Sequence, residues 1–299
     1  MGKALVGLIG GTGIGEALTE RTKGKRVEVN TPFGSPSGPV LLSEVGGQRV
    51  AILARHGPGH RFNPSQVPYR ANIFALKKLG VTHILASGAT GSLQDAIAPR
   101  SLVIADQVID KTLRPGRTFF EDLAVHVEFA YPFCPGLRAV LIEGGMDLET
   151  TVHPKGTYVC MEGPQFSTRA ESLQHRSWGA DLIGMTAMPE ARLAREAEIC
   201  YALIAVATDY DCWRPHEAGA SADEVLESIL ANVKAGTANA VELMKRAVPK
   251  IAEAVGPDCA CRSALAKAVW TDPKAVAPET LRRLEPLLGK YLGRAPKSP

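Results

Sequence analysis

Two acidic residues follow a strongly apolar run. The run Ala202–Ala207 is followed by Asp209 and Asp211. If the strand continues, side chains at positions i and i+2 point to the same face. A carboxyl group that is partly removed from water there has a raised pKa, and it can hold a proton or donate one to a ring nitrogen. The alternative interpretation is a helix or turn cap.

A glycine-rich turn follows the first apolar run. Gly10-Gly11-Thr12-Gly13 comes directly after residues 4–9, and such a turn can direct backbone N–H groups and the Thr12 hydroxyl at an anion. A dinucleotide fingerprint would need glycine where the sequence has Glu16, and no Gly-Lys-Ser/Thr follows as in a Walker loop. A purely structural turn remains the alternative.

The next apolar run, residues 50–53, ends in a basic pair. Arg55 and His56 come directly after Ala54, and His60 follows three residues after Gly57. An arginine offers a rigid fork of donors that matches phosphate oxygens, and an adjacent histidine can add another donor. Taken alone, the pair could equally be a solvated arginine and a capping histidine.

Later runs end in small or hydroxyl-bearing residues. Residues 83–86 are followed by a small-residue loop at 87–92, where a ligand can approach the backbone of Gly88 and Ala89 closely. Residues 182–185 end beside Thr186, whose hydroxyl can also reach an anion. Several strand ends are suited to an anion, and together they are stronger evidence for a phosphate site than any single one. Phe166 lies in another such loop and is either a core residue or an aromatic face for a flat base.

Apolar runs alternate with helix-like segments along the chain. The runs predicted to be strands are 4–9, 50–53, 83–86, 102–104, 157–161, 182–185 and 202–207. The segments 69–79, 169–178 and 189–199 between them are predicted helices. This alternation predicts a layered α/β domain with a mostly buried central sheet, and ligand groups at the carboxyl ends of its strands.

The strongest helix signal begins at Ser221, which forms a capping-box pattern with Glu224. The helix should run to about Val248, and a break at Gly236 is an open alternative. Beyond it the sequence changes to a proline-punctuated tail with an amphipathic segment at 278–292. We therefore expect one main domain at 1–250 and a helical extension at 251–299, which packs on the main domain or on a neighbouring subunit.

Composition argues against several classes of partner. The chain has 34 lysines and arginines against 31 acids, so its net charge of +3 is small and is not gathered into a basic arm. We therefore expect neither nucleic acid nor a membrane as partner. No cleavable signal pattern is visible, and no run reaches the roughly 18 apolar residues of a membrane span. A soluble, cytoplasmic protein is the expectation.

The cysteines do not have the pattern of a disulfide framework. Of the six, Cys134, Cys160, Cys200 and Cys212 are scattered, and we expect reduced thiols. Cys259 and Cys261 could form a strained, reducible bridge or half a metal site. Because no second Cys/His pair is nearby, we expect two ordinary thiols and no metal site.

Taken together, six motifs resemble the trimeric purine nucleoside phosphorylase family, specifically its branch that acts on 5′-methylthioadenosine. They are Gly-Gly-Thr-Gly at 10–13, Thr-Pro-Phe-Gly at 31–34, Ala-Arg-His-Gly at 54–57, Glu-Gly-Pro-Gln-Phe-Ser-Thr-Arg-Ala-Glu at 162–171, Met-Thr-Ala-Met-Pro-Glu at 185–190 and Ala-Thr-Asp-Tyr-Asp-Cys-Trp at 207–213. The resemblance covers residues 4–248. The residues that it implies for phosphate binding are Thr12, Arg55, His56 and Thr186, with the backbone of Gly88 and Ala89. A threonine is common in this branch where Gly88 stands, so one hydroxyl contact is missing or is replaced by Ser87.

The resemblance also implies how the nucleoside is bound. Phe166 and Ser167 would lie at the base and ribose, with Phe166 stacked on the purine, and the Met185 backbone would face the ribose hydroxyls. Asp209, supported by Asp211, would lie beside N7 and the 6-substituent. Phosphate would attack C1′ while a protonated Asp209 neutralises the departing base, so neither a metal nor an organic cofactor is expected.

The 5′-substituent is the least defined part of the implied site. The residues assigned to it are His60, His126, Ala222, Val225 and Leu226. His126 would reach it across a subunit interface of a homotrimer, or of a hexamer, unless it is simply a surface histidine. The competing functions are phosphorolysis of 5′-methylthioinosine or of 6-oxopurine nucleosides, non-catalytic nucleotide binding, and a dinucleotide oxidoreductase that Glu16 disfavours.

Overall fold

The computed structural model describes residues 5–20, 23–214 and 222–293. In that part of the chain eleven strands form one mixed sheet, in the order β2-β3-β4-β1-β5-β10-β9-β7, with β11 paired to β5, β6 to β11 and β8 to β6. The strands are β1 (Leu5–Gly10), β2 (Lys25–Val27), β3 (Val40–Val45), β4 (Gln48–Ala54), β5 (Val81–Ser92), β6 (Leu102–Ile104), β7 (Gln107–Asp110), β8 (Val152–His153), β9 (Thr157–Cys160), β10 (Leu182–Gly184) and β11 (Cys200–Asp209).

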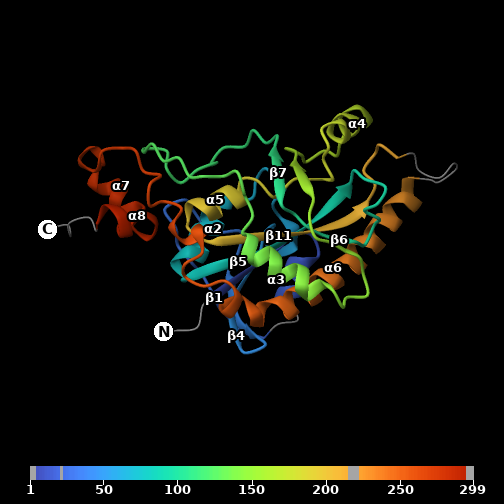
Figure 1. Ribbon diagram of the computed structural model, residues 1–299, viewed down its shortest axis with the longest axis horizontal. Coiled ribbons are helices and arrows are strands. Elements are labelled where there is room, and N and C mark those ends of the chain that lie inside the picture. The colour runs from blue at the N-terminus through green and yellow to red at the C-terminus, as the bar shows by residue number, and fades with distance from the viewer. Residues whose placement is uncertain (1–4, 21–22, 215–221, 294–299) are drawn as a thin grey trace.

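Helices cover both faces of this sheet (Figure 1). The α-helices are α1 (Ile14–Glu20), α2 (Tyr69–Lys78), α3 (Pro135–Gly145), α4 (Arg169–Ser177), α5 (Glu190–Glu196), α6 (Ala222–Ala254), α7 (Pro278–Arg283) and α8 (Glu285–Leu292), and the short 3-10 helices are η1 (Pro58–His60), η2 (Ala260–Ser263) and η3 (Pro273–Ala275). α3 and α6 pack together on one face, and α2 and α5 pack together on the other. The layered α/β fold expected from the alternating runs is confirmed.

The central strands run parallel, and this brings their functional ends together. β1 pairs in parallel with β4 and β5, and β5 pairs in parallel with β11 from His83↔Cys200 to Gly91↔Asp209. β1 is buried along its whole length and β11 along all but its last residue. Such strands read as continuous apolar runs because both faces are covered. The carboxyl ends of β1, β4, β5 and β11 therefore meet at one edge of the sheet.

Helix α6 is longer than expected and is not interrupted at Gly236. It continues through Gly236 and past Pro249 to Ala254. A Cβ atom at Gly236 would lie 2.3 Å from Cγ1 of Val206, so this glycine lets the helix pack closely on β11 rather than breaking it. The expected end near Val248 is therefore wrong, and the boundary drawn at residue 250 falls inside a helix. Ser221 lies outside the described residues, so its capping role stays a prediction.

The tail packs on the main domain of its own chain. Leu265, Leu284 and Leu288 are almost fully buried in the same core cluster as α2 and α5. The Trp270 N–H donates to the Ala124 carbonyl at 2.9 Å and ties the tail to the loop before α3. The amphipathic segment at 278–292 forms two helices, α7 and α8, because proline follows Glu285 at the start of the second.

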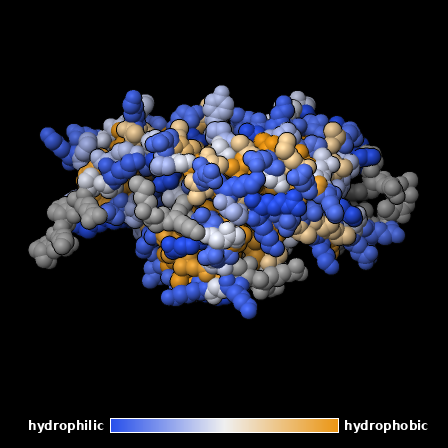
Figure 2. Space-filling model, turned by 60° about the horizontal axis from the view of Figure 1, so that its bottom comes forward, coloured by the Kyte–Doolittle hydropathy of each residue, from blue (hydrophilic) through white to orange (hydrophobic). Residues whose placement is uncertain are grey.

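The surface shows hydrophilic side chains around smaller apolar areas (Figure 2). Large apolar side chains that are exposed include Leu113, Tyr131, Phe166 and Trp270. Within the described ranges no helix is long and apolar enough to cross a membrane.

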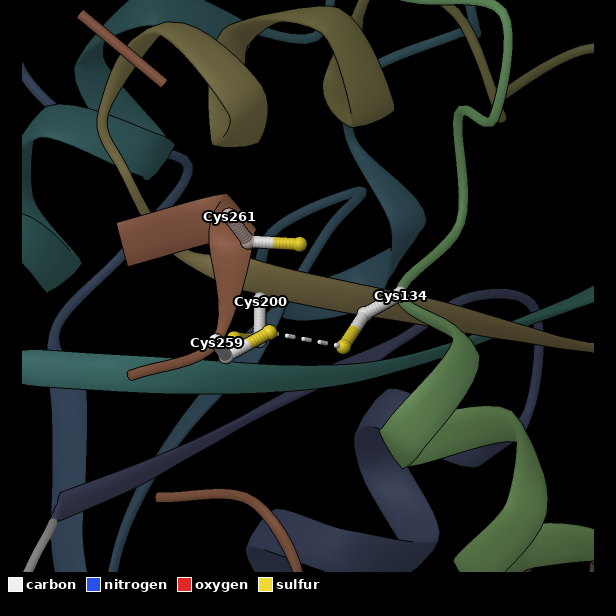
Figure 3. Close-up of side chains that lie close together, drawn as sticks. All are labelled: Cys134, Cys200, Cys259 and Cys261. Carbon is white, nitrogen blue, oxygen red and sulfur yellow. Dashed lines mark hydrogen bonds between the residues drawn. The ribbon is translucent and has the colours of Figure 1, made fainter. Parts of the chain in front are cut away.

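The expectation that no second Cys/His pair lies near Cys259 and Cys261 is wrong (Figure 3). The sulfur atoms of Cys134, Cys200, Cys259 and Cys261 all lie within 4.8 Å of one another. The cause is long-range packing: the tail after α6 folds back over the start of β11, beside the residue that precedes α3. A search for partners near Cys259 in the sequence could not reveal this arrangement.

Candidate active site

A cavity of about 490 Å³ opens at the sheet edge where the parallel strands end. This volume lies within the range of small-molecule sites. Its lining consists of Gly11, Thr12, His56, His60, Pro64, Gly88, Ala89, Thr90, Gly91, Met161, Pro164, Phe166, Ser167, Ile183, Gly184, Met185, Thr186, Thr208, Asp209, Asp211, Cys212, Ile229, Leu230 and Val233. Most site residues expected from the sequence are therefore brought together.

The glycine turn after β1 forms one wall of this cavity. A Cβ atom at Gly11 would lie 2.8 Å from Nη1 of Arg55 and 2.9 Å from the Ser87 carbonyl oxygen. Only glycine lets the turn lie this close to β5. Thr12 is exposed and lines the cavity, so its hydroxyl is available to a ligand.

Small residues of β5 face Thr186 across the same end of the cavity. Gly88 and Ala89 line it, and a Cβ atom at Gly88 would lie 3.4 Å from the Thr186 hydroxyl oxygen. Ser87 is fully buried, lies outside the lining, and its hydroxyl has no hydrogen-bond partner. It is therefore not placed to replace the hydroxyl that Gly88 lacks.

Arg55 lies behind the wall of the cavity rather than in its lining. Its side chain is completely buried, and Nε and Nη2 each donate to a Glu190 carboxylate oxygen at 2.7 Å. Nη1 donates to the Ser87 carbonyl at 2.7 Å. Burial acts to lower the pKa of Arg55, but the attraction of Glu190 outweighs it and holds that pKa above its ordinary value. One edge of the guanidinium is thus already occupied, and direct contact with phosphate stays a prediction.

His56 enters the cavity as a neutral ring. Burial, reinforced by the charge of Arg55, lowers the pKa of His56 to about 4. Its Nδ1 lies 2.8 Å from the Phe62 carbonyl oxygen and must donate to it, which leaves Nε2 as an acceptor. The ring stacks on His60 with centroids 4.2 Å apart. A neutral His56 can accept a hydrogen bond from a protonated phosphate oxygen.

The two acids also line the cavity, but a turn separates them. Asp209 is the last residue of β11, and Asp211 has a positive φ of 50°. The strand therefore does not continue, and the backbone N–H of Asp211 donates to Asp209 Oδ1 at 2.7 Å. The Thr208 hydroxyl donates to Oδ2 at 2.6 Å. These bonds fix the Asp209 carboxyl group, and its role as an acid stays a prediction.

Phe166, Ser167 and Met185 also line the cavity. The Phe166 side chain is 86% exposed. It is therefore not a core residue, and its face is free for a base or for a neighbouring subunit.

Of the two histidines expected at the 5′-substituent, only one lines the cavity. His60 lines the cavity, whereas His126 does not: its ring packs at a tilt against Trp270, with centroids 4.5 Å apart. The side chains of Ala222, Val225 and Leu226 lie outside the part of the chain that the structure describes. One turn further along α6, Ile229, Leu230 and Val233 form an apolar wall. Residues 229 and 233 are four positions apart and so share one face of the helix, but they were not assigned to the site from the sequence.

Arg114 organises the cavity wall and was not anticipated. It is almost fully buried, and Nη1 donates to the carbonyls of Pro64 and Met185 at 2.8 and 3.0 Å. Nη2 donates to the Glu162 carbonyl at 2.9 Å. One side chain thus joins three loops around the cavity. Its sequence context, Leu-Arg-Pro-Gly, belongs to no motif considered above, so only the fold could reveal this role.

The fold and the cavity together define an α/β enzyme of the nucleoside phosphorylase type, and comparison with known proteins supports this class. A family model described as phosphorylase superfamily matches residues 5–249. The S-methyl-5′-thioadenosine phosphorylase of Geobacter sulfurreducens is 45% identical, with 96% of this chain and 99% of the relative covered. A crystal structure of a methylthioadenosine phosphorylase from an antarctic soil metagenomic library superposes with a TM-score of 0.87 at 46% identity, covering 96% of this chain and all of the other. A variant of the adenosine/methylthioadenosine phosphorylase of Schistosoma mansoni, solved with methylthioadenosine, gives a TM-score of 0.81 at 35% identity, with 90% and 99% covered.

The chain therefore belongs to the phosphorylase superfamily, which confirms the resemblance seen in its motifs. The relative from Geobacter aligns over nearly the whole chain, so the tail is shared with it and is not foreign to the family.

Proposed function

We propose that the enzyme cleaves 5′-methylthioadenosine with inorganic phosphate, giving adenine and 5-methylthioribose 1-phosphate. The observation that carries this proposal is one cavity with three chemically distinct walls. Thr12, the Gly88 backbone and Thr186 suit an anion, Asp209 suits the nitrogen-rich edge of a base, and the apolar wall from α6 suits a methylthio group. The names of the relatives agree with this substrate.

The reaction follows from the charges that develop when the glycosidic bond breaks. The ribose gains positive character at C1′, and the departing purine gains negative charge. A phosphate oxygen attacks C1′ and supplies the new bond, while Asp209 gives a proton to N7 of the base. The neutral His56 accepts from a phosphate hydroxyl and so orients the nucleophile. Phosphate is a co-substrate, and we expect no further cofactor in this chemistry.

We also propose that the active form is a homotrimer that acts in the cytoplasm. Phe166 is 86% exposed at the cavity mouth, and Trp270, which packs against His126, is 71% exposed. A neighbouring subunit that carries His126 would cover the base and the 5′-substituent. Light scattering of the purified protein measures this directly, and a monomer with full activity would contradict it.

A phosphate-dependence assay tests the catalytic proposal. Purified enzyme is incubated with 5′-methylthioadenosine, 5′-methylthioinosine, adenosine or inosine, each with and without inorganic phosphate. We expect the highest kcat/KM with 5′-methylthioadenosine, and base release only when phosphate is present. Preference for either hypoxanthine nucleoside would assign the site to 6-oxopurines. Tight nucleoside binding without turnover would make the protein a binding module.

A further inference from the structure

Four cysteines meet at the end of the sheet remote from the cavity (Figure 3). The sulfurs of Cys134, Cys200, Cys259 and Cys261 lie within 4.8 Å of one another, with 3.7 Å between those of Cys134 and Cys259. All four are free thiols. Among the described residues no other group of three or more cysteine, histidine or acidic side chains converges in this way.

Three separate parts of the chain supply these sulfurs. Cys134 directly precedes α3, Cys200 is the first residue of β11, and Cys259 and Cys261 lie at η2 in the tail. The Cys134 N–H donates to the Tyr201 carbonyl at 2.8 Å, and the Arg262 N–H donates to the Cys259 carbonyl at 2.8 Å. The backbone therefore holds the sulfurs together, and their convergence does not depend on the cysteine side chains alone.

Because these sulfurs are largely removed from water, thiolates among them need a cation as partner. Cys134, Cys200 and Cys261 are buried, and Cys259 is half-buried. Cys134 also lies at the N-terminus of an 11-residue helix, where a thiolate is stabilised. Several thiolates this close together repel one another unless a cation lies among them.

We propose that Cys134, Cys200, Cys259 and Cys261 bind one Zn²⁺ ion in a tetrahedral tetrathiolate site. Zn–S bonds of about 2.3 Å place the sulfurs of such a site roughly 3.8 Å apart, and the four sulfurs already converge to within 4.8 Å. Each thiol that binds gives up its proton to solvent. Four protein ligands fill the tetrahedron and leave no open position for a substrate, so the ion stabilises structure.

The location of the site indicates what the ion holds together. It joins the tail at η2 to α3 and to the start of β11. Asp209 stands nine residues further along β11, which is roughly 30 Å at the usual rise per residue of a strand. Zn²⁺ at this site therefore fixes the tail on the main domain without contacting the substrate.

Metal analysis of the whole enzyme tests the proposal. Protein is purified under reducing conditions from cells grown with added zinc, freed of loosely bound metal, and measured by plasma mass spectrometry. We expect close to one zinc per chain. Co²⁺ titrated into reduced, metal-free enzyme should give the sulfur-to-cobalt charge-transfer bands and the intense visible bands of tetrahedral thiolate coordination.

Variants assign the ligands. Cys259→Ser and Cys261→Ser should lose the bound zinc and the cobalt charge-transfer bands. The matched control is Cys160→Ser, which alters a buried thiol outside the group and should retain both. Zinc-free wild-type enzyme with no cobalt–thiolate spectrum would overturn the proposal, as would a disulfide among the four cysteines in protein taken from the cell under alkylating conditions. The wild-type measurements decide the proposal by themselves, so it stays testable even if a variant fails to fold.

Discussion

The two ends of strand β11 carry different kinds of chemistry on one rigid element. At its carboxyl end, Asp209 faces a cavity that glycines and backbone atoms leave open. At its amino end, Cys200 is buried among three other thiols. The first end is formed by strand ends that converge because the strands are parallel, whereas the second is formed by the tail folding back. The comparison indicates that catalysis and attachment of the tail are separable.

The largest expected effect concerns the catalytic end. Asp209→Asn keeps the shape of the side chain but removes the acidic proton. We expect kcat/KM for 5′-methylthioadenosine to fall by about 10²- to 10⁴-fold, with a relative gain toward 6-oxopurine nucleosides, because an amide can donate to a 6-oxo group. Steady-state kinetics with both substrates measures this change.

Asp211→Asn is the matched control for that variant. The backbone N–H of Asp211, not its side chain, donates to Asp209, so the bond survives the substitution. The loss should therefore be much smaller than at Asp209. Equal losses in both variants would show that the two acids act as one unit, and an unchanged Asp209→Asn enzyme would remove Asp209 from the mechanism.

The sequence predicted the cavity better than it predicted the cysteine group, and the reason is physical. Thr12, His56, Gly88 and Asp209 each follow an apolar run, and parallel strands necessarily bring such ends together. The roles of Arg114 and the cysteine group depend on how loops and the tail pack, and no local spacing encodes that. Gly236 shows the same limit, because its closeness to Val206 exists only in the folded chain.

The second effect concerns the buried ion pair behind the cavity. Glu190 accepts from Arg55 through two bonds and from the Tyr201 hydroxyl at 2.8 Å. Glu190→Gln leaves the Arg55 charge buried without a counter-ion, so we expect the free energy of unfolding to fall by about 3–5 kcal/mol. Urea denaturation of the variant and the wild type measures this difference in the free energy of unfolding. Tyr201→Phe, which removes one bond to the same carboxylate, should cost about 1–3 kcal/mol, and a larger loss there than in Glu190→Gln would contradict this ranking.

The third effect is a pH dependence that originates at His56. Its pKa is about 4 in the folded enzyme, below the ordinary 6.5. Between these values the unfolded chain binds more protons, so stability is lost as the pH falls from 6.5 toward 4. A shift of this size corresponds to about 3 kcal/mol across the window. Unfolding curves at pH 7 and 4.5, at fixed protein concentration, should show a weaker acid loss in His56→Gln than in the wild type. If the variant and the wild type lose equal stability between pH 7 and 4.5, other groups cause the acid sensitivity.

The smallest expected effect tests whether the two ends of β11 are independent. Cys259→Ser removes one sulfur from the remote group and touches nothing that lines the cavity. We expect kcat and both KM values of the folded enzyme to stay near wild type, because roughly 30 Å of rigid strand separates the group from Asp209. The melting temperature should fall by several degrees, since the tail then loses one of its attachments to α3 and β11. Kinetics below the transition, compared with thermal unfolding of the same samples, separates the two outcomes. If fully folded Cys259→Ser loses much of its kcat while its melting temperature is unchanged, the tail acts on the chemistry itself. Only a coupling along β11 or through a neighbouring subunit could then carry the change to the cavity.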